Sequence, residues 1–182
     1  MFHPGIASNH SDDQPFSWTD KPYHPPTEKF KNAPVCHDHD GDHGDTISHD
    51  HLHTNVFCPV TVSSQPGGSL PDIQTTQTAV SMLQSLQTNT SQPFFMAVGL
   101  HKPHIPHKFP RQFLQYHPFT NISLPDNHYI PSKLPSVAWN PYTSLRRRHD
   151  VAQSRPGWPY GPLDQTLGRR IIQVHTIYDY LA

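Results

Sequence analysis

The sequence has no long apolar run, few charged residues and few cysteines, and each shortage excludes a class of protein. No stretch reaches the roughly 18 consecutive apolar residues of a membrane helix, so we expect no membrane span. Charged residues make up only 15% of the chain and the net charge is −1 with neutral histidines, which excludes a permanently basic nucleic-acid-binding protein. Two cysteines allow at most one internal disulfide.

Proline and histidine are instead in excess. The 21 prolines among 182 residues divide the backbone into extended segments and turns, and hydrophobic residues account for only 34%. A loop-rich chain of this kind has difficulty burying a core by itself, which predicts that it is part of something larger. Protonation of all 16 histidines would change the net charge from −1 to +15 and favour polyanions in an acidic compartment. The alternative is that buried or metal-bound histidines never become charged.

Glycosylation motifs point to the secretory pathway. Sequons begin at Asn9, Asn89 and Asn121. Residues 1–13 have neither the basic region nor the apolar core of a signal peptide. Sequons without a leader predict a secreted protein whose true N-terminus is missing from this sequence.

Apolar periodicity predicts an α/β fold. A helix is expected to begin with Asp72 as its N-cap and to end near residues 88–90. Its apolar stripe comprises Ala79, Val80, Met82, Leu83 and Leu86. Phe94–Leu100 is apolar throughout and predicts a fully buried strand. A helix followed by a buried strand is typical of α/β proteins. Two further helices are expected over 111–117 and 165–182.

The strongest chemical signal, His-Lys-Pro-His-Ile-Pro over residues 101–106, follows this expected strand. In open α/β sheets, ligands bind beyond the carboxyl ends of the strands. The imidazoles of His101 and His104 and the ammonium of Lys102 would there protonate a leaving group or bind an anionic ester. The alternative is that His101 and Lys102 are the solvated end of a strand.

A second feature is a low-complexity tract over residues 37–53, which holds six histidines and five aspartates. Such a tract binds zinc, nickel or copper either at a specific site or by incidental chelation, and the sequence favours the incidental mode because the loop lacks apolar anchors. Cys36 and Cys58 flank the tract. In a secreted chain they are expected to pair, whereas a cytosolic chain would leave them as free thiols.

Several motifs together resemble the sulfatase family. They occupy residues 2–13, 15–18, 22–25, 58–60, 93–106, 121–124 and 159–162, in the order found in sulfatases. The resemblance implies a lysosomal enzyme of the alkaline-phosphatase-like α/β fold, with a mixed sheet flanked by helices. Its implied reaction is hydrolysis of 2-sulfate esters of iduronate in heparan and dermatan sulfate, which are sulfated glycosaminoglycans. Residues 1–182 would be the middle part of the catalytic domain, incomplete and loop-rich.

The resemblance also assigns roles to individual residues. His104 matches the histidine thought to protonate the departing sugar oxygen, and His3 matches one thought to help expel sulfate. Cys36 and Cys58 match a family disulfide, although the tract between them enlarges its loop. Asn9 and Asn121 match glycosylation sites, whereas Asn89 does not obviously match one.

Two parts of a sulfatase are not found in the sequence. The family's nucleophile is a formylglycine made from the cysteine of a Cys-x-Pro-Ser-Arg motif, and its calcium is held by aspartates and an Asp-His pair. We therefore expect both to lie outside this chain, in the remainder of a sulfatase, and the chain alone to be inactive. The alternative hypothesis is a non-catalytic, histidine-rich secreted glycoprotein module that binds metal ions or polyanions.

Overall fold

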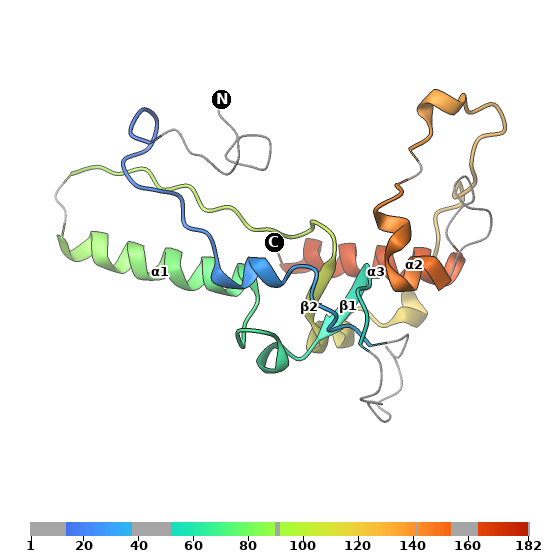
Figure 1. The fold of residues 1–182 in the computed structure, drawn as a ribbon, viewed down its shortest axis with the longest axis horizontal. Coiled ribbons are helices and arrows are strands. Elements are labelled where there is room, and N and C mark those ends of the chain that lie inside the picture. Colours follow the sequence, from blue (N-terminus) through green and yellow to red (C-terminus); the bar gives the residue numbers. More distant parts are fainter. Residues whose placement is uncertain (1–13, 38–51, 90–91, 141, 154–163, 182) are drawn as a thin grey trace.

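A two-stranded parallel sheet lies at the centre of the molecule. The computed structural model describes residues 14–37, 52–89, 92–140, 142–153 and 164–181. Strand β1 (Phe57–Val60) pairs with β2 (His107–Pro110), and helix α1 (Pro71–Asn89) belongs to the connection between them (Figure 1). Parallel strands need such a crossover because a tight turn cannot join them. The expected α/β arrangement is confirmed at this level, but the sheet in the described residues is parallel, not mixed.

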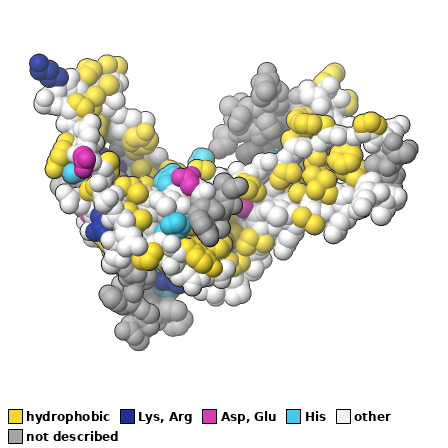
Figure 2. Space-filling model, turned by 180° about the vertical axis from the view of Figure 1, so that it is seen from behind, with side chains coloured by type: hydrophobic (Ala, Val, Ile, Leu, Met, Phe, Trp, Pro, Cys, Tyr) yellow, Lys and Arg dark blue, Asp and Glu magenta, His cyan; other side chains and the backbone are white. Residues whose placement is uncertain are grey.

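Helix α1 matches the predicted helix in its bounds but not in its cap. It begins at Pro71. Proline is favoured in the first helical turn because the backbone N–H groups there have no acceptor within the helix, so the N–H that proline lacks is not needed. Asp72 therefore lies inside the first turn and is not the N-cap. The expected apolar stripe is also solvent-exposed, with Val80, Met82 and Leu83 between 43% and 48% accessible. Hydrophobic side chains gather on the arm of the molecule that contains α1 (Figure 2).

The buried strand predicted for Phe94–Leu100 is wrong. These residues have no regular secondary structure, and their trace runs back along α1 (Figure 1). Phe95 is 82% exposed, with Trp18 stacked against it at a ring-centroid distance of 6.1 Å. The apolar run indicates burial only where neighbouring strands are available to pair with it, and the described chain supplies none at this segment.

Helix α3 (Gln165–Leu181) confirms the predicted C-terminal helix and covers the sheet. The carboxylate of Asp164 caps its start by accepting the N–H groups of Thr166 (2.7 Å) and Leu167 (3.0 Å). Val174 and Ile177, one turn apart, are buried against Phe109 of β2. The five-residue helix α2 (His149–Gln153) precedes α3 and places Val151 in a second cluster, with Val56 and Leu167.

The remaining described elements are short 3₁₀ helices, in keeping with the many prolines. They are η2 (Pro26–Phe30), η3 (Val62–Ser64), η4 (Arg111–Tyr116), η5 (Phe119–Asn121), η6 (Ser136–Ala138) and η7 (Leu145–Arg147). The helix expected over 111–117 is thus found as a 3₁₀ helix. No helix in the described part combines the length and apolarity needed to cross a membrane.

Cys36 and Cys58 form a disulfide, as expected for a secreted chain. Their sulfurs are 2.10 Å apart, and the two residues are separated by 22 positions. Cys58 is fully buried in β1 and packs with Val60 and Leu70, so the disulfide fixes residues 36–37 beside the sheet. The backbone of Cys36 also pairs with His53 in an antiparallel bridge.

Candidate functional site

The His101–Pro106 loop connects the exposed apolar segment to β2. It therefore precedes a strand of the sheet, and the expectation that it follows the carboxyl end of a buried strand is wrong. A hydrogen bond from the N–H of His104 to the carbonyl of His101 (3.0 Å) closes a turn within it. His101, Lys102 and His104 are thereby brought together on one short turn.

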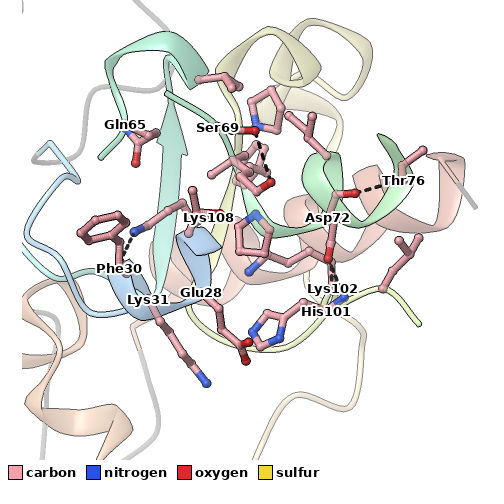
Figure 3. A pocket seen from close by; sticks show the side chains of 18 of the residues that line it. Glu28, Phe30, Lys31, Gln65, Ser69, Asp72, Thr76, His101, Lys102 and Lys108 are labelled. Atoms are coloured by element: carbon pink, nitrogen blue, oxygen red, sulfur yellow. Dashed lines mark hydrogen bonds between the residues drawn. The ribbon is translucent and has the colours of Figure 1, made fainter. Parts of the chain in front are cut away.

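The carboxylate of Asp72 holds the start of this loop. It accepts the backbone N–H of His101 at 2.6 Å and that of Lys102 at 3.1 Å, drawn as dashed lines in Figure 3. Because residues 93–100 do not join the sheet, these two N–H groups have no strand partner and take the carboxylate instead. Asp72 thus connects the first turn of α1 to the loop.

The ammonium of Lys102 holds the end of the same loop. Its Nζ donates hydrogen bonds to the carbonyls of His104 (3.1 Å) and Pro106 (2.5 Å). Burial lowers the pKa of Lys102 to about 8, helped by the positive charges of Lys108 and Lys31 and opposed by Asp72. Lys102 therefore stabilises the end of the loop through its hydrogen bonds and also places a positive charge at the site.

The two loop histidines differ in their surroundings. Their ring centroids are 5.1 Å apart. His104 is exposed, and its Nδ1 donates to the carbonyl of Ile105 at 2.7 Å, because a carbonyl oxygen can only accept. This bond leaves Nε2 as the nitrogen that can act on a substrate. Burial lowers the pKa of His101, assisted by the charges of Lys102, Lys31 and His104 and opposed by Asp72.

A pocket of about 740 Å³ lies next to the loop, between η2, α1, β2 and α3. About half of its lining residues are apolar, and its basic side chains are Lys31, Lys102, Lys108 and His101 (Figure 3). Glu28 and Asp72 are its acidic residues. His104 does not line this pocket itself, but its ring lies beside that of His101, which does.

Sequence reasoning did not single out two further groups, one of them at this pocket and the other beside it in β2. Tyr178 of α3 lines the pocket, and its buried hydroxyl has no hydrogen-bond partner among the described residues. Burial raises the pKa of this hydroxyl. His107, the first residue of β2, is 2% exposed, and burial lowers its pKa to about 4. Tyr178 follows the apolar Val174 by one helical turn, and this spacing could have indicated that Tyr178 is buried. No local pattern distinguishes His107 from a solvated histidine.

Other residues singled out in the sequence are scattered or lie outside the described residues. His3 and Asn9 belong to the latter group, as does most of the 37–53 tract. His53, from the end of the tract, stacks on His149 with ring centroids 3.6 Å apart. Asn89 is the last residue of α1, and Asn121 is exposed at the end of η5.

The described residues do not fit the two groups that sulfatase chemistry implies. They contain no set of three or more histidine, cysteine, aspartate or glutamate side chains placed to hold a metal ion. Both cysteines are consumed by the disulfide, so neither is available for conversion to formylglycine.

Comparison with known proteins confirms the resemblance read from the motifs. The chain is 45% identical to iduronate 2-sulfatase of mouse (Mus musculus) over 173 residues, which are 95% of this chain and 30% of the mouse protein. It is 44% identical to human (Homo sapiens) iduronate 2-sulfatase over the same share of each chain. The chain therefore spans about a third of the length of these curated relatives. No family model matches it.

Proposed function

We propose, on the premise of this similarity to iduronate 2-sulfatases, that the chain supplies the leaving-group acid of a sulfatase that hydrolyses 2-sulfate esters of iduronate in heparan and dermatan sulfate. The observation that carries the proposal is the arrangement of His104. Its Nδ1 is held by the carbonyl of Ile105, which fixes the ring and directs Nε2 away from the backbone. An oriented imidazole on an exposed turn suits general acid catalysis.

In this proposal, His104 acts on the bond between sulfur and the sugar oxygen. As that bond breaks, negative charge develops on the departing oxygen, and a proton on Nε2 of the imidazolium neutralises it. The bond from Nδ1 to Ile105 stays in place in both protonation states, because Nδ1 carries a hydrogen in each. The ring therefore needs no reorientation during proton transfer.

His101 and Lys102 are proposed to bind the anionic substrate. An ammonium has three N–H donors, and the carbonyls of His104 and Pro106 use two of those of Lys102. The third remains for a carboxylate or sulfate oxygen. Lys31 and Lys108 add positive charge at the same pocket, which favours a glycosaminoglycan chain over a neutral sugar.

The rest of the chemistry is assigned to residues outside the described part or outside this sequence. His3 is proposed to help expel sulfate after the ester is cleaved. When present, formylglycine would supply the nucleophile and calcium would supply positive charge at the sulfate. Because both cysteines form the disulfide, the 182-residue chain is expected to show no turnover by itself.

A lysosomal location and glycosylation at Asn9, Asn89 and Asn121 follow from the same proposal. Asn121 is accessible to the glycosylation machinery in the described structure. The proposed partner is the remainder of a sulfatase chain, arranged in the alkaline-phosphatase-like fold. It would cover the exposed apolar residues of α1 and of the segment 93–100.

The decisive experiment is a chimaera in which this chain replaces the 173 aligned residues of mouse iduronate 2-sulfatase. Turnover of 4-methylumbelliferyl iduronide 2-sulfate is measured for the chimaera and for His104→Ala. We expect the substitution to lower kcat by about 10²–10⁴, the usual contribution of a general acid.

His128→Ala is the matched control, because the Nδ1 of His128 also lies against a nearby carbonyl, that of Pro125, at 2.9 Å. It should leave kcat within about twofold. A loss below tenfold for His104→Ala in a folded chimaera would remove His104 from the mechanism. An inactive, folded chimaera that binds heparin or zinc would favour the histidine-rich binding module.

A further inference from the structure

We propose that Asp72 is the positioning residue of the candidate site: its carboxylate holds the His101–Pro106 loop to α1 and thereby sets where the ring of His104 lies. The effect of Asp72 on catalysis rests on the proposed function of His104. Its structural content stands on the contacts alone. Asp72 lines the same pocket, but its hydrogen bonds go to the backbone N–H groups of His101 and Lys102, and it acts through the backbone of the loop.

The first support is the geometry of the contact. One carboxylate accepts two consecutive N–H groups, 2.6 Å from His101 and 3.1 Å from Lys102, across sequence separations of 29 and 30 residues. Two bonds from adjacent residues fix both the position and the direction of the backbone, whereas one bond would allow rotation about it. Charge-assisted bonds of this kind are about twice as strong as neutral ones.

The second support is the absence of another restraint on this side of the loop. The residues that lead into it, 93–100, make no strand pairing in the described structure, so no sheet ladder aligns the loop from its N-terminal side. On the other side, the loop is anchored by β2 and by the ammonium of Lys102 at the carbonyls of His104 and Pro106. Asp72 therefore supplies the missing N-terminal anchor.

The third support is electrostatic. The charged groups that influence His101 are Lys102, Lys31 and His104, all of which lower its pKa, and Asp72, which alone among them raises it. Lys102 is likewise influenced by Lys108 and Lys31, against Asp72. Asp72 thus offsets part of the positive charge that Lys31, Lys102 and Lys108 place around the start of the loop.

The test compares Asp72→Asn and Asp72→Glu with Asp164→Asn in the 182-residue chain. Asp164 is the matched control because it also accepts two backbone N–H groups at the start of a helix, those of Thr166 and Leu167, but far from the loop in sequence. Amide hydrogen exchange is measured by NMR together with the titration of the His101 ring. These readouts need no turnover.

We expect Asp72→Asn to accelerate exchange at the amides of His101 and Lys102 by about ten- to a hundredfold, as expected for losing a charged acceptor. It should also lower the pKa of His101, because the carboxylate that raises this pKa in the described structure is removed. Asp72→Glu keeps the charge and should restore the pKa of His101 while displacing the loop. Asp164→Asn should change neither the exchange nor the titration.

Unchanged exchange at His101 and Lys102 in Asp72→Asn would overturn the proposal, as would an equal loss of protection throughout α1. The same variants in the mouse chimaera separate this inference from the proposed function. If Asp72 positions His104, Asp72→Asn lowers kcat at least tenfold with KM within about twofold. If exchange responds to Asp72→Asn but His104→Ala leaves kcat unchanged, the sulfatase assignment of His104 fails while the positioning role of Asp72 in the fold stands.

Discussion

The carboxylate of Asp150 accepts the backbone N–H of Val56 with both of its oxygens, each 2.9 Å away, although 94 positions separate the two residues. It also accepts the N–H of Phe57 and that of Val151, each at 2.9 Å. Asp150 is 2% exposed and Val56 is 1% exposed. A single buried side chain therefore joins α2 to the start of β1.

Replacing Asp150 by alanine should destabilise the chain strongly. The substitution leaves three N–H groups near the sheet without their acceptor, and unsatisfied buried donors cost about 1–3 kcal/mol each, so a total of about 3 kcal/mol is a conservative expectation. For a chain of this size, that corresponds to a fall in Tm of about 6–12 °C. A thermal melt followed by circular dichroism measures it.

The control for this substitution is Asp126→Ala, which removes an exposed carboxylate from a loop and should shift Tm by about 1 °C or less. If the two variants melted at the same temperature, Asp150 would not link α2 to the sheet.

Loss of the disulfide should have an effect of similar size. Cys36→Ser together with Cys58→Ser opens a covalent loop whose ends are 22 positions apart, and closing such a loop contributes about 3 kcal/mol by limiting the unfolded chain. Urea unfolding of the double variant, compared with the oxidised parent, gives the difference. Reduction of the parent with dithiothreitol should reproduce the result, and a variant as stable as the oxidised parent would contradict the expectation.

The stability of the chain should fall in mild acid because of His107. Burial lowers the pKa of His107 to about 4 in the fold, with the charges of His175, Lys102 and His104 acting in the same direction. The unfolded chain has the ordinary pKa near 6.5 and binds a proton first as the pH falls. The contribution of neutral His107 to the free energy of unfolding is fully present above pH 6.5 and is lost as the pH falls from 6.5 to about 4.

The expected loss from His107 alone is about 2 kcal/mol between pH 7 and pH 5. His107→Gln removes the titration, so the free energy of unfolding should depend less on pH in that window than it does in the parent. His24→Ala, which alters an exposed histidine, serves as the control. Parallel pH profiles for the parent and His107→Gln would show that His107 is not buried in its neutral form.

Lys102 should titrate far below an ordinary lysine. Its pKa is lowered from 10.5 to about 8, first by burial and then by Lys108 and Lys31. The unfolded chain binds the proton more tightly, so stability from this group increases between pH 8 and pH 10.5 and is smallest below pH 8. NMR of the lysine ε-carbons follows the titration, and Lys102→Met identifies the signal. A midpoint near 10 would contradict the burial of this ammonium.

Local sequence signals predicted those elements whose stability comes from nearby residues. Helix α1 ends where its sequence suggests, at Asn89, because turn-forming residues follow it. Helix α3 begins at Gln165, directly after the carboxylate cap of Asp164. The pairing of Cys36 with Cys58 followed from there being two cysteines in a chain with secretory features. The motif that contains His104 was likewise recognised from the identity of its residues alone.

Long-range contacts decided the rest. Phe94–Leu100 has the composition of a buried strand, yet it stays exposed because a strand needs hydrogen-bonded neighbours that no local pattern can specify. Phe57–Val60 is too short to be predicted as a strand from its own sequence, and it becomes a strand only by pairing with His107–Pro110, about 50 residues later. Asp72 carries the signature of a helix cap, but its carboxylate binds two N–H groups 29 and 30 residues away. The sequence determined which chemical groups the loop carries, and the tertiary structure determined what holds them, because unpaired backbone donors take whichever acceptor the fold brings within reach.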